Sequence, residues 1–116
     1  MSTAHIHVHA RVMSEDVRAL GPGKADLLER IDEAGSISGG ARAMGMSYRR
    51  AWLLVEEMNA AFVTPLVEAT TGGSGGGGAT LTPLGRDMLA RFRKLQAGLS
   101  AEAARHLAGF RKHLKD

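Results

Sequence analysis

The spacing of apolar residues changes several times along this chain, and each change predicts a new element. Residues 5–12 alternate strictly, with Ile6 and Val8 on one face and histidines on the other, which is typical of a half-buried strand. Residues 24–34 place apolar side chains on one side and charged ones on the other, as an amphipathic helix does. Between these segments, residues 14–23 are rich in turn formers and predict a connector.

Residues 36–62 predict two helices separated by a tight turn. Ser36 is suited to cap the first helix, Gly45 to end it in the left-handed region, and Ser47 to cap the second. The period of 3.6 gives the second helix a buried face, formed by Ala51, Leu54, Val55, Met58 and Phe62. Its opposite face would carry Arg49, Leu53 and Glu56, with Arg50 and Trp52 on the flanks and Trp52 at the edge of the core. This arrangement is the frame of a helix-turn-helix reader of DNA.

A β-hairpin is predicted after the second helix. Residues 65–69 and 79–82 are short apolar runs, and six of the seven residues from 72 to 78 are glycine. Glycine loses more backbone entropy on ordering than any other residue, so this run belongs to no packed core. It is interpreted as the tip of a hairpin, a "wing", that approaches a partner closely, in preference to a linker between domains. It lacks the Gly-Lys-Ser/Thr ending of a phosphate-binding loop.

The last third of the chain predicts a long helix or two consecutive helices. Thr82 is suited to cap the start and Pro83 to occupy the first helical position. Apolar residues then follow spacings of four and three, as in the seam of a helix–helix contact. The pattern shifts near Gly98 and Ser100, which predicts either a stutter or a break. Because the apolar stripe is longer than one small core needs, a second copy of the chain is its simplest partner.

Length, charge and composition limit the number of domains and the kinds of partner that this chain can have. At 116 residues and 12.3 kDa, the chain is predicted to form residues 1–83 as a winged helix-turn-helix and residues 84–116 as a helical dimerisation segment of the same domain. The fold class expected is mainly α with a small β-hairpin. The net charge of +3 permits DNA as a partner without demanding it. Without cysteine, an apolar run of membrane-spanning length or a signal peptide, we expect a cytoplasmic, nucleoid-associated protein with no membrane partner.

The histidines are the candidate metal ligands. His5, His7 and His9 would share one strand face, but side chains at i, i+2 and i+4 lie nearly 7 Å apart, which is long for three ligands of one ion. A solvated or dimer-facing strand is the favoured interpretation, and a metal-responsive repressor stays open as an alternative. We expect no cofactor, and no enzymatic activity, because no grouping of nucleophile, base and acid is visible.

Two segments together carry a family resemblance: GSISGGARAMGMSYRRAWLLVEEMN and TGGSGGGGATLTPLG. They resemble the N-terminal DNA-binding domain of the ModE family of molybdate-dependent transcriptional regulators and are more distantly similar to the winged helix-turn-helix of LysR-type regulators. The resemblance implies a homodimer that binds a palindromic operator in double-stranded DNA. Positions carried over for DNA binding are Ser36, Ser38, Ser47, Tyr48, Arg49, Arg50, Gly72, Gly73, Ser74, Gly75 and Gly76. Positions expected in the dimer interface are Ile6, Val8, Met88, Phe92, Leu95, Leu99, Leu107 and Phe110.

Two departures from the family pattern limit what is carried over. The chain stops at Asp116, before the oxyanion-binding domains of the full-length regulators, so no molybdate site is expected in it. The wing has Ser74 where a basic residue is expected, which weakens the case for a strong contact between wing and phosphate. The predicted function is therefore a DNA-binding transcriptional regulator. A winged-helix module that binds a protein partner instead of DNA is the other alternative.

Overall fold

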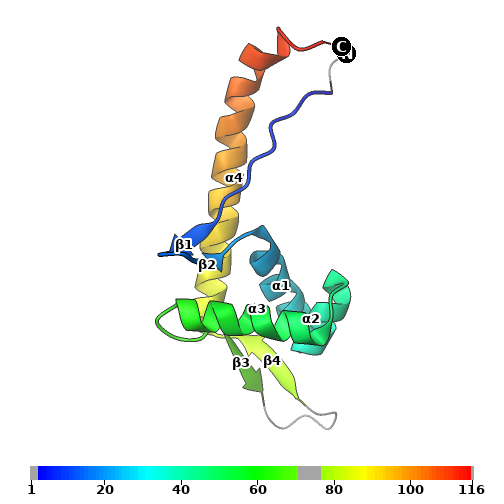
Figure 1. Ribbon diagram of the computed structural model, residues 1–116, viewed down its shortest axis with the longest axis vertical. Coiled ribbons are helices and arrows are strands. Elements are labelled where there is room, and N and C mark those ends of the chain that lie inside the picture. Colours follow the sequence, from blue (N-terminus) through cyan, green and yellow to red (C-terminus); the bar gives the residue numbers. More distant parts are fainter. Residues whose placement is uncertain (1–2, 71–76, 116) are drawn as a thin grey trace.

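The computed structural model describes residues 3–70 and 77–115, and they form an elongated molecule with principal extents of 59 × 29 × 22 Å (Figure 1). The elements in chain order are β1 (Val12–Ser14), β2 (Val17–Leu20), α1 (Pro22–Ala34), α2 (Ile37–Met44), α3 (Tyr48–Ala61), β3 (Val67–Thr70), β4 (Gly78–Leu81) and α4 (Pro83–Arg111). The strands form two antiparallel hairpins, β1–β2 and β3–β4. The predicted class, a mainly α winged helix-turn-helix with a small hairpin and a long C-terminal helix, is confirmed.

The core lies between α1, α2 and α3, with β2, the β3–β4 hairpin and the first part of α4 against it. Leu27, Leu28 and Ile31 of α1 are fully buried, as the amphipathic pattern of that helix predicts. Helices α1 and α2 approach closely at Gly40, where a Cβ atom would lie 2.6 Å from Cγ1 of Ile31. The close crossing therefore requires glycine at this position.

The helix ends predicted around the helix-turn-helix are confirmed. The Ser36 hydroxyl accepts a hydrogen bond from the backbone N–H of Gly39 at 2.9 Å, and that of Ser47 accepts from Arg50 at 3.1 Å. Gly45 ends α2 with φ of 68°, in the left-handed region where glycine is not strained. These caps depend on residues within four positions of one another, which is why the sequence pattern located them.

The N-terminal part of the chain differs from the prediction. Residues 5–11 belong to neither sheet, because no described strand of this chain pairs with them, and the predicted connector contains a hairpin instead. β1 and β2 are joined through Glu15, whose φ is 54°, a conformation that non-glycine residues seldom adopt. The turn has neither glycine nor asparagine, the residues typical of a tight hairpin, so the turn formers of residues 14–23 predicted a connector and not a hairpin. Ala19 and Leu20 of β2 are buried and add to the core.

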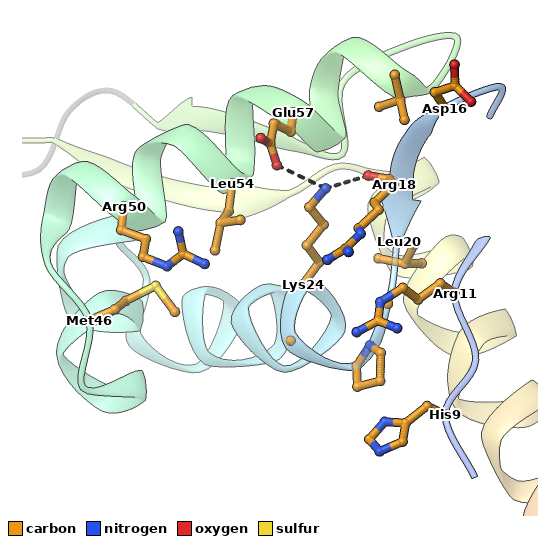
Figure 2. A pocket seen from close by; sticks show the side chains of 14 residues that line it. His9, Arg11, Asp16, Arg18, Leu20, Lys24, Met46, Arg50, Leu54 and Glu57 are labelled. Carbon is orange, nitrogen blue, oxygen red and sulfur yellow. Dashed lines mark hydrogen bonds and ion pairs between the residues drawn. The ribbon is translucent and has the colours of Figure 1, made fainter. Parts of the chain in front are cut away.

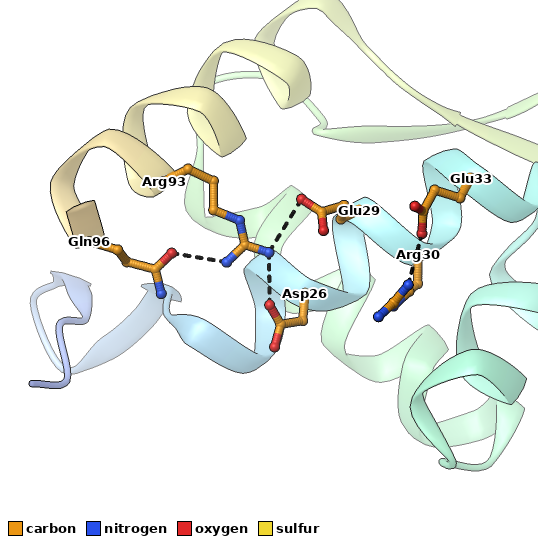
Figure 3. A network of polar contacts seen from close by, with 6 residues as sticks. All are labelled: Asp26, Glu29, Arg30, Glu33, Arg93 and Gln96. Atoms are coloured by element: carbon orange, nitrogen blue, oxygen red, sulfur yellow. Dashed lines mark hydrogen bonds and ion pairs between the residues drawn. The ribbon is translucent and has the colours of Figure 1, made fainter. Parts of the chain in front are cut away.

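Helix α4 is one continuous helix of 29 residues, without a break near Gly98. Two of the residues predicted for a dimer interface are used inside the monomer: Phe92 is 2% exposed, and Met88 packs against the same core. Arg93 fixes α4 to α1 through Asp26 at 2.7 Å and Glu29 at 3.5 Å (Figure 3). The core contacts of α4 therefore end near Phe92, and the remainder of the helix projects away from the globular part (Figure 1).

The N-terminal residues run back along the projecting part of α4 (Figure 1). At the far end, the Arg111 guanidinium donates a hydrogen bond of 3.4 Å to the carbonyl oxygen of Ala4. Ile6 and Val8 are 37% and 38% exposed. These two residues, predicted to lie in the dimer interface, therefore remain accessible beside α4.

Gly85 provides a test of how tightly α4 is fitted against the start of the wing. A Cβ atom there would lie 2.1 Å from the carbonyl oxygen of Leu66, which is backbone and has little freedom to move. We expect Gly85→Ala to lower the melting temperature by at least about 5 °C, because overpacking costs about 1–3 kcal/mol. Thermal unfolding followed by circular dichroism measures the shift.

Gly98 is the matched control in the same helix. A Cβ atom there meets no other atom within 4 Å, so Gly98→Ala should raise stability by about 0.5–1 kcal/mol through helix propensity alone. Equal melting temperatures for the two variants would contradict the close packing of α4 on Leu66.

Candidate nucleic-acid interface

The first turn of α3 is open to solvent. Tyr48 is 56% exposed, and Arg49 and Arg50 are exposed as well. The same helix holds Ala51, Val55 and Met58 in the core, which fixes its rotation about its axis. The first turn is therefore presented outward on a rigid element, as predicted.

Arg49 and Arg50 leave α3 in different directions. Arg50 lines a cavity bounded by α3, the start of α1 and the β1–β2 hairpin (Figure 2). Trp52 lies on the other flank and lines a groove toward the wing. The flanking positions predicted for Arg50 and Trp52 are confirmed. Trp52, interpreted from the sequence as a residue at the edge of the core, is 43% exposed.

Apart from Arg111, which donates to the Ala4 carbonyl, the arginines of the described residues fall into two sets. Those of α1 and α4 that form ion pairs are neutralised by carboxylates; Arg86, for example, donates two hydrogen bonds to Asp32 at 2.9 and 3.0 Å. The second set forms no ion pair or side-chain hydrogen bond with any described residue: Arg11, Arg18, Arg42, Arg49 and Arg50. All of the second set lie outside α1 and α4. Four of these five unpaired arginines lie in β2, α2 and α3, around the helix-turn-helix.

The base of the wing is fixed to α3 by one side chain. The Asn59 oxygen accepts hydrogen bonds from the backbone N–H groups of Leu66 and Val67 at 2.8 and 3.2 Å, and its amide nitrogen donates to the Val67 carbonyl at 3.1 Å. β3 then pairs with β4 from Val67 opposite Leu81 to Thr70 opposite Gly78. The Ala79 N–H donates to the Gly35 carbonyl at 2.9 Å, which holds β4 against the turn before α2.

The tip of the wing lies outside the described residues. Gly72, Gly73, Ser74, Gly75 and Gly76, which were predicted to contact DNA, all fall in residues 71–76. The two strands on either side of them are present, and the hairpin prediction is confirmed at that level.

A groove of about 320 Å³ separates the wing from α3 and the start of α2. Tyr48 and Trp52 line it from α3, one turn apart, and Ser38 lines it from α2. Glu56 and Glu68 are the acidic residues among those that line the groove. Of these two aromatic residues, Tyr48 was predicted to contact DNA and Trp52 was not. Their i, i+4 spacing places both rings on one helix face.

The two serines at the start of α2 occupy different positions. Ser36 is the N-cap, and its hydroxyl oxygen accepts from Gly39, which leaves the hydroxyl hydrogen free to donate. Ser38 is exposed in the first turn. Both lie at a helix start, where unpaired N–H groups favour a phosphate oxygen.

The three N-terminal histidines do not converge on a common point. The rings of His7 and His9 stack with centroids 4.5 Å apart, and the ring of His5 lies 6.4 Å from that of His7. Over residues 3–70 and 77–115, no group of three potential ligands has a metal-binding arrangement. None of the helices in these residues combines the length and apolar character needed to cross a membrane.

Asn59 is expected to set the orientation of the wing relative to α3. Replacing it (Asn59→Ala) leaves two backbone N–H groups without a partner, at a cost of about 1–3 kcal/mol. In the variant, amide hydrogen exchange at Leu66 and Val67 should become faster than in the native chain. Exchange at Ala25, in the core, should not change. Unchanged protection of both amides would show that the β3–β4 pairing alone holds the base of the wing.

The fold and its exposed, cationic helix start define the class of protein: a winged helix-turn-helix. Residues 24–86 match the family of bacterial regulatory helix-turn-helix proteins of the lysR type. This match covers more than half of the chain, so the chain belongs to that family. The resemblance to the ModE-type N-terminal DNA-binding domain is also confirmed.

Individual relatives refine this assignment. The molybdenum-pterin-binding protein MopB of Rhodobacter capsulatus is 41% identical over 95 residues, which are 82% of this chain and 34% of that protein. The DNA-binding transcriptional dual regulator ModE of Escherichia coli K12 is 47% identical over 68 residues, which are 59% of this chain and 26% of that protein. The molybdenum transport protein ModE of Herbaspirillum seropedicae is 44% identical over 70 residues, 60% of this chain and 26% of that protein. The chain thus spans about a third or less of the length of these relatives.

Proposed function

We propose that this chain binds double-stranded DNA as a homodimer and regulates transcription from a palindromic operator. The observation that carries the proposal is the first turn of α3, where Tyr48, Arg49 and Arg50 are exposed and neither guanidinium is paired with a described carboxylate. Unpaired arginines suit both phosphates and guanine edges, and arginine on guanine is the commonest specific contact. A relative that shares this segment is named as a DNA-binding regulator.

Within this proposal, each element has a distinct role. The start of α3 enters the major groove, with Tyr48 and one of the two arginines reaching base edges and the other arginine on the backbone. Ser36 and Ser38 meet a phosphate at the start of α2. The wing, residues 72–78, approaches the adjacent backbone, and its few side chains let it come close.

The dimer in this proposal forms through the projecting part of α4 and the N-terminal segment beside it. Leu95 and Phe110 are 42% and 61% exposed, and Ile6 and Val8 are similarly accessible. Leu99 and Leu107 are half-buried on the same helix. Exposed apolar side chains along a projecting helix and the segment beside it are a common site of self-association.

Sequencing of the DNA fragments that the purified chain selects from a random duplex library tests the proposal. A dimer with two-fold symmetry should select an inverted repeat whose half-sites are centred about 10–10.5 base pairs, or about 34–36 Å, apart. Selection of a single half-site would contradict the dimer, and no enrichment together with no salt-dependent gel shift would favour the module that binds a protein partner.

A further inference from the structure

The cavity that Arg50 lines is distinct from the groove at the wing. It lies on the other flank of α3, between that helix, the start of α1 and the β1–β2 hairpin (Figure 2), and has a volume of about 720 Å³. Four cationic side chains line it, Arg11, Arg18, Lys24 and Arg50, together with His9. They come from four separate parts of the chain, so the fold brings them together.

The charges of this cavity are not balanced by its own carboxylates. Lys24 is paired: its side chain is only 10% exposed, and its ammonium group lies 3.1 Å from Glu57 and donates to the Arg18 carbonyl. Asp16 is the other acidic residue of the lining, and it forms no ion pair with a described residue. Two positive charges thus remain in excess, and Arg11, Arg18 and Arg50 have no described ion-pair partner.

The unpaired arginines of this cavity differ from the paired arginines of α1 and α4. Arg93 faces two carboxylates and an amide oxygen within 3.5 Å (Figure 3). Arg11, Arg18 and Arg50 line one cavity without a carboxylate partner among the described residues, so their guanidinium groups are available to an anion. A guanidinium group matches the oxygens of a phosphate with two parallel N–H groups.

We propose that this cavity is a binding site for a phosphate-type oxyanion. Two sources supply the same chemistry: a phosphodiester of the DNA backbone on the side of α3 opposite the wing, or a free phosphate dianion. The first source rests on the proposed function, and the second does not. Arg50 belongs both to the cavity and to the first turn of α3. A DNA phosphodiester in the cavity is therefore one of the contacts through which α3 binds DNA, whereas a free phosphate there changes DNA affinity, and DNA changes phosphate affinity by the same factor.

The first experiment titrates inorganic phosphate against the whole chain by calorimetry, at constant ionic strength set with chloride. It compares the native chain with Arg11→Gln/Arg18→Gln, which leaves the first turn of α3 intact. The matched control is Arg30→Gln/Arg105→Gln, which removes the same charge from two exposed arginines that are paired on their own helices. A free-anion site predicts saturable binding of phosphate that weakens at least tenfold in the first variant and is unchanged in the control.

The second experiment measures the salt dependence of duplex DNA binding for the same three proteins. A backbone phosphate in the cavity predicts that the slope of log affinity against log salt falls by about 0.9 for each bound protomer in Arg11→Gln/Arg18→Gln only, because each phosphate that the protein neutralises contributes about 0.9 to that slope. The proposal is overturned if neither measurement separates the variant from the control. Should the native chain bind no duplex at all, the proposed function fails, and the phosphate titration alone decides this site.

Discussion

Replacing both arginines of the first turn of α3 (Arg49→Ala/Arg50→Ala) is expected to weaken operator binding at least thirtyfold. Both side chains are exposed and unpaired within the described residues, so their removal disturbs no internal ion pair there. Each good contact of arginine with DNA contributes about 1–3 kcal/mol, and two such contacts multiply in the equilibrium constant. Fluorescence anisotropy with a labelled operator and with a scrambled duplex measures both affinities.

The salt dependence in the same variant separates phosphate contacts from base contacts. If both arginines contact phosphates, their removal lowers the slope by about two for each bound protomer and weakens operator and scrambled duplex alike. If one of them contacts a base, its removal weakens the operator more than the scrambled duplex. Since Arg50 points into the cationic cavity and Arg49 does not, the single variants should differ, with Arg50→Ala showing the larger change in slope.

A charge-matched variant makes the test specific. Arg30→Ala/Arg105→Ala also removes two positive charges, but each of these arginines is paired with a glutamate on its own helix, at 3.1 and 2.9 Å. It should lose less than about threefold in affinity, because distant charges are screened at physiological salt. If both double variants lost the same affinity, net charge and not the first turn of α3 would govern binding.

The helix-turn-helix was predictable because its signals are local. A cap and a left-handed glycine act within one turn of chain, so Ser36, Gly45 and Ser47 predict both ends of α2 and the start of α3. The same holds for Thr82 at the start of α4, whose hydroxyl accepts from Gly85 at 2.9 Å.

The features that were missed depend on distant parts of the chain. A strand exists only if a partner is available, and residues 5–11 have the alternation of a strand but no partner among the described strands. Phe92 fits the spacing of an exposed seam, yet the core of its own chain covers it. Periodicity gives the face on which a residue lies, but not what covers that face.

The charges illustrate the same limit at the candidate site. The ion pair of Arg86 with Asp32 joins residues 54 positions apart in the sequence, and that of Arg93 with Asp26 joins residues 67 positions apart. The sequence shows how many arginines there are but not which of them a carboxylate has already neutralised. The set left unpaired, and the cavity that collects Arg11, Arg18 and Arg50, became visible only once the elements were placed in space.

The second large effect is expected at the projecting part of α4, where Leu95→Asp/Phe110→Asp should convert a dimer into a monomer. Both side chains are exposed, so the substitutions leave the core of the single chain intact and the melting curve of the monomer cooperative. In a dimer, however, they would bury four carboxylates in an apolar contact, which costs far more than the contact contributes. Sedimentation equilibrium at several concentrations measures the change in mass.

DNA affinity in this variant should fall in a way that depends on the number of half-sites. A dimer gains about 10²–10⁴ in apparent affinity from binding two linked half-sites, so the full operator should bind at least about a hundredfold more weakly. A duplex with one half-site should bind as before, because the first turn of α3 is unchanged. Ala101→Asp/Ala108→Asp adds the same charge at two exposed positions on another face of α4 and should remain dimeric. If Leu95→Asp/Phe110→Asp also stayed dimeric, the interface would have to lie away from this stripe, and the spacing of the two reading helices would be set by another surface.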